Sequence, residues 1–216
     1  MTVREIYRQY KIPAFLQLHQ LRVTSVAKQI VQHFDSPLDE RSIILACLFH
    51  DMGNIIKIDF SRFPESFEPE GVAYWKHVQE DFFRRFGLNE HQATIAIGHE
   101  LHLPLQVMKY IDGVGFGKLE ASRDTPSYEQ KIVEYADTRV APHGVTSMIK
   151  RLEEARERYA KRESEMPKDA KRYDELHAAA IAIEQQIFAK TQIRPEQITE
   201  TSIQPLIEKF NDFQVA

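Results

Sequence analysis

The stretch "LACLFHDMGN" (residues 45–54) ends an apolar run with two ionisable side chains, His50 and Asp51. The helix predicted around it, from about residue 38 to 51, is apolar on nearly all sides, which is typical of a central, buried helix. A buried ionised side chain is costly unless it is paired or bound to a metal. This pair therefore marks a candidate site in the core of the protein.

Helical periodicity continues on both sides of this stretch. Leu16, Val23, Val26 and Ile30 recur at three- and four-residue intervals, and His19 lies on the same stripe. In "SPLDE" (36–40), a capping serine and a first-turn proline predict the start of the central helix. The sequence therefore predicts a long helix that contains His19, followed by the central helix.

Further helices are predicted after the central one. An apolar stripe indicates a helix from about 71 to 86 that stops at Gly87, and another should run from about 89 to 103. "DTPSYEQ" (124–130) should start a helix that continues through "KIVEYADTRV" (131–140). No segment shows convincing strand alternation, so the predicted fold is all-α, a helical bundle.

Residues 53–70 interrupt this pattern with two prolines, three phenylalanines and no helical period. A loop of this length often serves as a lid or a binding loop. Phe60, Phe63 and Phe67 would supply apolar or base-stacking surface, or would simply pin the loop to the bundle. "GVGFGK" (113–118) lacks the spacing of a phosphate-binding loop, so a flexible turn is the better interpretation.

Composition limits the class of protein. The 216 residues carry 28 basic and 32 acidic side chains, a net charge of −4, which gives no strong nucleic-acid signal. The longest apolar run, 43–49, is too short to cross a bilayer, and the first residues do not resemble a signal peptide. We expect a soluble, cytoplasmic protein without a membrane partner, in which Cys47 is a core residue.

The character of the chain changes near residue 145. "MIKRLEEARERYAKRE" (148–163) has glutamates four residues before basic residues, and a second apolar stripe follows Pro167. We expect residues 1–144 to form a metal-binding helical domain and residues 145–216 a C-terminal helical extension packed on it. A homo-oligomer formed through the hairpin at about 145–190 is left open.

The candidate site residues are imidazoles and carboxylates near apolar stripes. They are His19, His50, Asp51, His77, His99, His102 and Asp137. Asp137 lies in "EYADTRV" (134–140) among apolar neighbours, where a lone carboxylate would be costly. This mixed set of nitrogen and oxygen donors suits a divalent metal such as Mn, Fe, Co or Ni, with Mg as an alternative.

Three motifs together resemble the HD superfamily of metal-dependent phosphohydrolases, whose pattern is His…His-Asp…Asp on a helical bundle. They are "HQLRVTSVA" (19–27), "LFHDMGN" (48–54) and "EYADTRV" (134–140), and the resemblance covers roughly residues 15 to 142. It implies that His19, His50, Asp51 and Asp137 bind a first metal. In branches with two metals, His77 and His99 stand where the additional ligands would be expected, so one or two ions are implied.

The resemblance also implies the chemistry: hydrolysis of a small-molecule phosphoester or phosphoanhydride, expected to be a nucleotide, by metal-activated water. In catalysis Asp51 would bridge two metal ions or orient the reacting groups. Many members follow the dipeptide with a small residue and Lys, but Asn54 stands here, so Lys57 would substitute as a phosphate contact. Arg22 and Arg139 would be further catalytic contacts to phosphate, or ordinary surface pairs.

Two alternatives use the same residues. Some HD proteins are di-iron oxygenases with six ligands of these types, so the ligand inventory does not exclude that chemistry. A non-catalytic protein that senses nucleotides and binds a partner through the charged hairpin is the other alternative. Full activity with Co or Mn under anaerobic conditions would remove the oxygenase, and tight nucleotide binding without turnover would distinguish the sensor from a hydrolase.

Overall fold

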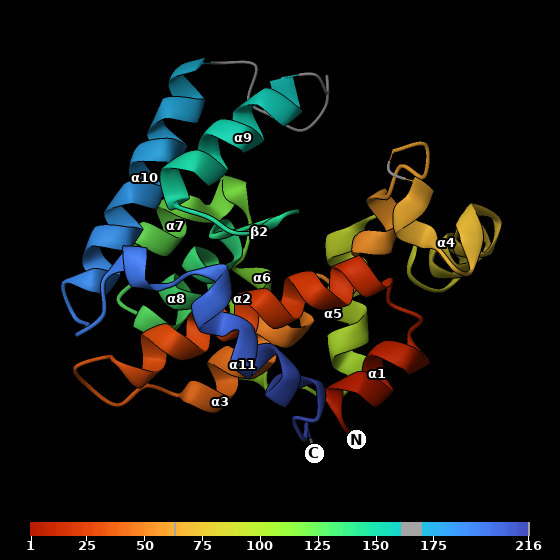
Figure 1. Cartoon of the computed structure of the whole chain (residues 1–216), viewed down its shortest axis with the longest axis horizontal. Coiled ribbons are helices and arrows are strands. Elements are labelled where there is room, and N and C mark those ends of the chain that lie inside the picture. The colour runs from red at the N-terminus through yellow and green to blue at the C-terminus, as the bar shows by residue number, and fades with distance from the viewer. Residues whose placement is uncertain (63, 161–169, 216) are drawn as a thin grey trace.

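The computed structural model describes residues 1–62, 64–160 and 170–215, and it confirms the all-α prediction (Figure 1). The α-helices of the described residues are α1 (Val3–Gln9), α2 (Ala14–Gln32), α3 (Glu40–Phe49), α4 (Gly71–Phe86), α5 (Glu90–Glu100), α6 (Leu105–Asp112), α7 (Leu119–Asp124), α8 (Tyr128–Thr138), α9 (Met148–Ala160), α10 (Ala170–Phe188) and α11 (Glu200–Asn211). Short 3-10 helices are η1 (Asn54–Lys57), η2 (Pro64–Phe67), η3 (Phe116–Lys118) and η4 (Pro195–Gln197).

Helix α3 is the central helix, as its composition predicts. Every residue from Ser42 to Phe49 is buried, and the helix packs against α2, α6 and α8. Its start differs from the prediction, because Asp39 and not Ser36 accepts the backbone N–H of Ser42 at 3.1 Å. A carboxylate at this position also interacts favourably with the positive end of the helix dipole.

The other predicted helices agree with the structure to within a few residues. Helix α4 has the predicted bounds and ends at Gly87, whose φ of 84° is readily adopted only by a residue without a side chain. Helix α8 starts after the capping residue Ser127 and ends at Thr138, because a small β-hairpin follows it. In that hairpin β1 (Val140–Ala141) pairs antiparallel with β2 (Gly144–Val145).

The segment from residue 53 to 70 is fixed to the bundle by specific contacts. The side-chain amide of Gln79 on α4 donates hydrogen bonds to the carbonyls of Ile55, Ile56 and Ile58. Phe60 and Phe67 are buried and stack on each other with ring centroids 4.9 Å apart. These two aromatic rings therefore pin the loop to the core, while Phe63 lies outside the described residues.

The C-terminal helices pack on the same bundle. Helix α10 contacts α7 and α8, while α11 lies along α2 (Figure 1). One cluster of buried apolar residues extends from Val3 to Phe210. The two ends of the chain also meet, where Thr2 and Gln214 form an isolated β-bridge. The predicted packing of the extension agrees with these contacts, while the domain boundary at residue 144 stays a prediction.

Among the residues that the structure describes, no helix combines the length and the apolar character that crossing a bilayer requires.

Candidate metal centre

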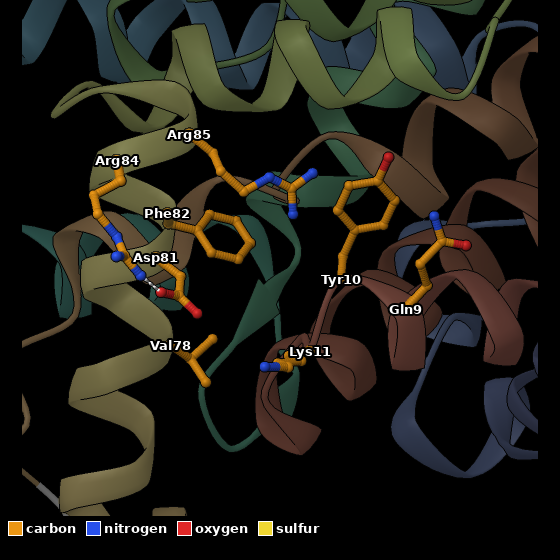
Figure 2. Close-up of a pocket in the computed structure, with 8 residues that line it drawn as sticks. All are labelled: Gln9, Tyr10, Lys11, Val78, Asp81, Phe82, Arg84 and Arg85. Atoms are coloured by element: carbon orange, nitrogen blue, oxygen red, sulfur yellow. Dashed lines mark hydrogen bonds and ion pairs between the residues drawn. The ribbon is translucent and has the colours of Figure 1, made fainter.

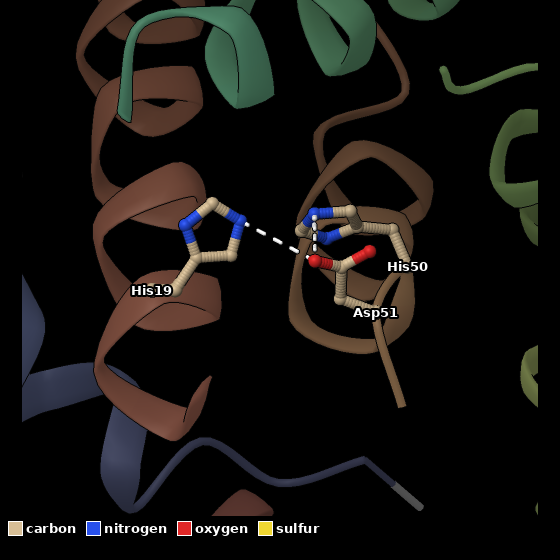
Figure 3. A group of neighbouring side chains, drawn as sticks. All are labelled: His19, His50 and Asp51. Atoms are coloured by element: carbon tan, nitrogen blue, oxygen red, sulfur yellow. Dashed lines mark ion pairs between the residues drawn. The ribbon is translucent and has the colours of Figure 1, made fainter. Parts of the chain in front are cut away.

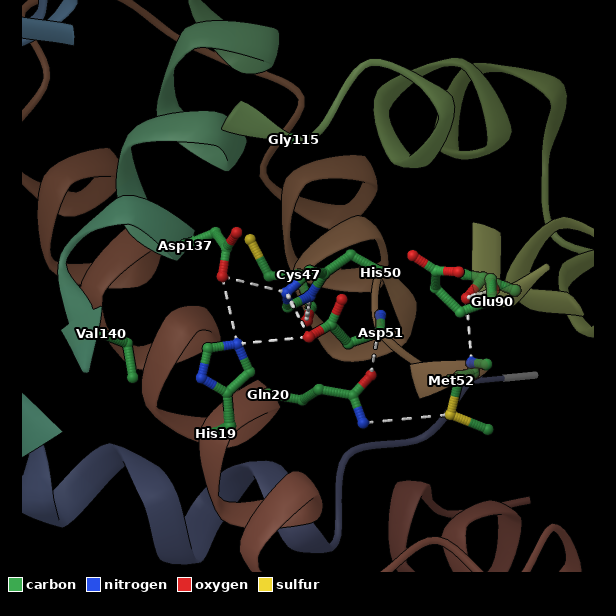
Figure 4. A network of polar contacts seen from close by, with 12 residues as sticks. His19, Gln20, Cys47, His50, Asp51, Met52, Glu90, Gly115, Asp137 and Val140 are labelled. Carbon is green, nitrogen blue, oxygen red and sulfur yellow. Dashed lines mark hydrogen bonds and ion pairs between the residues drawn. The ribbon is translucent and has the colours of Figure 1, made fainter. Parts of the chain in front are cut away.

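Four of the predicted ligands meet: His19 from within α2, His50 and Asp51 from the end of α3, and Asp137 from the last turn of α8. The Nε2 atom of His19 lies 3.1 Å from Oδ1 of Asp137 and 3.6 Å from Oδ2 of Asp51. The Nε2 atom of His50 lies 3.3 Å and 3.7 Å from the same two oxygens. The imidazoles of His19 and His50 therefore face the Asp51 carboxylate (Figure 3) and also that of Asp137 (Figure 4).

The end of α3 sets the orientation of His50. Its Nδ1 lies 2.9 Å from the carbonyl oxygen of Cys47, one turn earlier, and this hydrogen bond requires the proton on Nδ1. The unprotonated Nε2 of a neutral ring then faces the carboxylates. A hydrogen bond of this kind on the far nitrogen is the usual way in which proteins orient a histidine ligand.

Gln20 holds the backbone of Asp51 and was not identified from the sequence. It is completely buried, and its side-chain oxygen accepts the N–H of Asp51 at 3.3 Å. Its side-chain amide also points at the sulfur of Met52, 4.0 Å away (Figure 4). Its position directly after His19 is the only signal that the sequence offers. The contact connects α2 to the end of α3 beside the ligands.

The electrostatics of the cluster favour charged groups close together. Burial lowers the pKa of His50, but Asp51 and Asp137 outweigh burial and raise this pKa to about 9. Burial would raise the pKa of Asp137, yet His50 and His19 hold it well below its usual range. The imidazoles and the carboxylates therefore stabilise the charged forms of one another.

The donor set fits a divalent metal ion and is open on one side. The side chains of His19, Asp51 and Asp137 are 20%, 23% and 29% exposed, whereas that of His50 is only 1% exposed. Two imidazoles and two carboxylates suit borderline transition metals, and the exposed side leaves room for water and substrate. The residues present therefore fit a catalytic metal site.

The other predicted metal ligands do not join this cluster. His77 on α4 is exposed, and its nearest ion-pair partner is Glu80 at 3.7 Å. His99 and His102 are exposed at and after the end of α5. Among the residues that the structure describes, the potential metal-binding group of three or more side chains is His19, His50 and Asp51. A second ion bound by His77 and His99 remains a prediction.

Both arginines, predicted either to contact phosphate or to form ordinary pairs, have partners away from the cluster, and their contact with phosphate stays a prediction. Arg22 pairs with Glu200 on α11, where its Nη2 lies 2.7 Å from Oε1 of the glutamate. Arg139 is 3% exposed and donates hydrogen bonds to the Tyr135 hydroxyl and to the carbonyls of Thr146, Pro195 and Ile198. Each guanidinium therefore joins secondary elements: Arg22 connects α2 to α11, and Arg139 anchors the β-hairpin and η4.

Lys57 lies in η1, six residues after Asp51. Its side chain is 44% exposed, and its Nζ lies 3.9 Å from Oε1 of Glu90. Lys57 was predicted to take the place of the lysine found in related motifs. Its ammonium group is accessible to solvent in the segment that follows Asp51. The sulfur atom of Cys47 is buried and burial raises its pKa, in agreement with the predicted core role.

Glu134 is a second buried group that the sequence analysis did not single out. It lies one turn before Asp137 on α8, and its Oε2 accepts the N–H of Gly115 at 2.9 Å. Burial raises its pKa to about 8, although that hydrogen bond lowers it. The rejected phosphate-loop motif at 113–118 is thus held by a carboxyl group of α8.

A pocket away from the cluster has no predicted site residue in its wall. It has a volume of about 180 Å³ and lies between the end of α1 and α4 (Figure 2), lined by Gln9, Tyr10, Lys11, Val78, Asp81, Phe82, Arg84 and Arg85. Its charged groups pair locally: Arg84 with Asp81, and Arg85 with Glu100 at 3.1 Å. The metal-binding cluster is therefore the better candidate for a catalytic site.

Comparisons with known proteins agree with this geometry. No curated protein and no solved structure matches the chain significantly. A family model described as "HD domain" matches residues 17–187, most of the chain, and this range contains all four clustered ligands. The chain therefore belongs to the HD domain family, in the superfamily of metal-dependent phosphohydrolases.

Proposed function

We propose that this protein is a metal-dependent phosphohydrolase that acts on a phosphoester or phosphoanhydride of a nucleotide. The observation that carries the proposal is the convergence of His19, His50, Asp51 and Asp137, whose facing nitrogen and oxygen atoms lie 3.1–3.7 Å apart. Membership of the HD domain family supports the reaction class.

The cluster supplies a rigid and partly open cradle for the ion. Asp137 presents one oxygen to both imidazoles, while the backbone of Cys47 fixes the ring of His50. A divalent ion held by these groups supplies Lewis acidity, because it lowers the pKa of water and polarises a phosphoryl group. Since the ligands come from three helices of the core, their geometry is set before a substrate arrives.

Asp51 is the side chain of the cluster best placed to handle a proton. Its Oδ2 faces the two imidazoles, whereas Oδ1 is turned away from them (Figure 3). We propose that Oδ1 orients the attacking water and accepts its proton. The hydrogen bond from the Asp51 backbone to Gln20 keeps the carboxylate in this position.

Lys57 is proposed to contact the phosphate from the loop side. It follows the dipeptide by six residues and stays close to Glu90 on α5. A flexible ammonium group at the edge of the site suits recognition of a phosphate as a point charge. Arg22 is less suited, because Glu200 would have to release it first.

A substrate screen tests the proposal. The metal-loaded protein is assayed with nucleoside mono-, di- and triphosphates, cyclic nucleotides and dinucleoside polyphosphates, with Mn, Co, Fe or Mg supplied. We expect turnover of at least one compound, and loss of that turnover in Asp51→Ala. Full activity with Mn or Co without oxygen also excludes the di-iron oxygenase alternative. Absence of turnover throughout the panel, with metal bound, would contradict the proposal.

A further inference from the structure

Phe15 is an exposed aromatic side chain on the same helix as the metal ligand His19. Its relative exposure is 39%, in a chain whose large apolar side chains are mostly buried. It precedes His19 by four residues on α2, so the two side chains lie on one face of the helix, one above the other. The exposed ring is therefore a direct neighbour of the metal centre.

The ring of Phe15 is supported from behind. It packs edge-to-face against Phe67 with centroids 5.6 Å apart, and Phe67 stacks in turn on Phe60. Phe67 and Phe60 are buried and belong to the loop that follows Asp51. Phe60 and Phe67 thus do not themselves face solvent, but they support the ring of Phe15, which does.

The spacing between Phe15 and the ligands suits a nucleotide. Four residues of α-helix rise about 6 Å, the same order as the separation of a base from its phosphate across one ribose. The ligands His19, Asp51 and Asp137 are themselves partly exposed, so a phosphate at the cluster has open space beside it. Helical side chains lean toward the N-terminus, which places the ring of Phe15 beyond His19, where a base would extend.

We propose that Phe15 is a specificity-determining residue on which the base of a nucleotide substrate stacks while its phosphate lies at the metal centre. This inference rests on the proposed function and deepens it, since it requires a substrate with a planar ring. Aromatic side chains stack on all bases, so we expect discrimination between nucleotides and base-free phosphoesters, with little preference among bases.

The experiment compares nucleoside 5′-monophosphates with ribose 5-phosphate, which keeps the phosphoester and lacks the base. Dissociation constants for the metal-loaded protein are measured by calorimetry, together with KM where turnover occurs. Stacking on an aromatic side chain corresponds to about a ten- to hundredfold change in affinity. We expect Phe15→Leu to weaken nucleotide binding by that factor, to leave ribose 5-phosphate binding unchanged, and to keep the metal content.

Matched variants separate stacking from packing. Phe15→Leu retains apolar contact with Phe67, and Phe15→Tyr should retain tight nucleotide binding. Leu88→Ala, at an exposed apolar position after α4, serves as the surface control. Equal effects of Phe15→Leu on nucleotides and ribose 5-phosphate, or no effect on either, overturn the inference alone. If the metal-loaded wild type neither binds nor hydrolyses these compounds or any nucleotide of the substrate screen, the inference and the proposed function fail together.

Discussion

The substitution Gly53→Ala should disturb the metal centre through a steric conflict that can be read directly from the structure. A Cβ at Gly53 would lie 2.1 Å from the carbonyl oxygen of Glu90 and 2.8 Å from the backbone nitrogen of Thr94. Both atoms belong to the backbone at the start of α5, so no side-chain rotation relieves the conflict. The φ of Gly53 is −87°, which any residue adopts, so close approach alone requires glycine here.

The loss of stability is the sum of two costs, a steric overlap and a broken hydrogen bond. Overpacking against a rigid neighbour costs about 1–3 kcal/mol. Movement of Gly53 also breaks the 2.9 Å hydrogen bond from its N–H to the Thr94 hydroxyl, and a buried donor left unpaired costs about 1–3 kcal/mol. Taking roughly 3 kcal/mol for the sum, we expect Tm to fall by about 6–12 °C for a chain of this size. Because Asp51 lies two residues earlier, divalent-metal affinity should fall about ten- to hundredfold.

Thermal unfolding and metal titration of Gly53→Ala test this reasoning against Gly117→Ala. A Cβ at Gly117 would meet no atom within 4 Å, and its backbone is not in the left-handed region. The control should therefore match the wild type in both measurements. Gly53→Ala with the Tm and metal affinity of the control would refute the claim that close packing on α5 positions the ligand segment.

Three further predictions concern residues around the cluster. Lys57→Ala should raise KM or lower kcat about tenfold at unchanged metal content, because a charge-assisted phosphate contact is worth about 1.5–3 kcal/mol; wild-type kinetics would remove Lys57 from the site. Gln20→Leu should weaken metal binding, measured by titration, because it removes the acceptor of the Asp51 N–H; unchanged affinity would leave Gln20 only a packing role. Since the pKa of Glu134 is raised from 4.5 to about 8, the folded state binds this proton more tightly, and metal-free wild type should lose stability relative to Glu134→Gln as pH rises from 5 to 8. That loss is at most about 5 kcal/mol, and parallel curves of Tm against pH for the two proteins would contradict it.

Local sequence patterns were sufficient for the helices and for placing His50 and Asp51 at the end of a buried helix. The apolar stripe of α4 and its terminating Gly87 define that helix within the sequence itself, and His50 and Asp51 mark the end of the most buried helix. The packing of His19 and Asp137 against this pair was predicted by the family resemblance. Periodicity alone places each on a helix face and does not bring the two helices together.

The parts that could not be predicted depend on contacts between distant segments. Arg22 looked like a phosphate contact because it follows His19 by three residues, yet its partner Glu200 lies 178 positions later. Arg139 follows Asp137 by two residues and therefore points away from the face of α8 that carries Asp137. Its guanidinium donates hydrogen bonds to the backbone carbonyls of Pro195 and Ile198. Spacing from a ligand identifies neighbours in sequence, whereas the tertiary partner decides which way a long side chain turns.

Metal content is the measurement that tests the central claim most directly. Wild type, Asp137→Ala and His33→Ala are produced in metal-supplemented medium, purified without chelator and compared by elemental analysis. The four-ligand centre predicts a bound divalent transition metal in the wild type, its loss in Asp137→Ala, and retention in the exposed His33→Ala control. A wild type without metal, or Asp137→Ala with as much metal as the wild type, would contradict the assignment of this cluster as a metal centre.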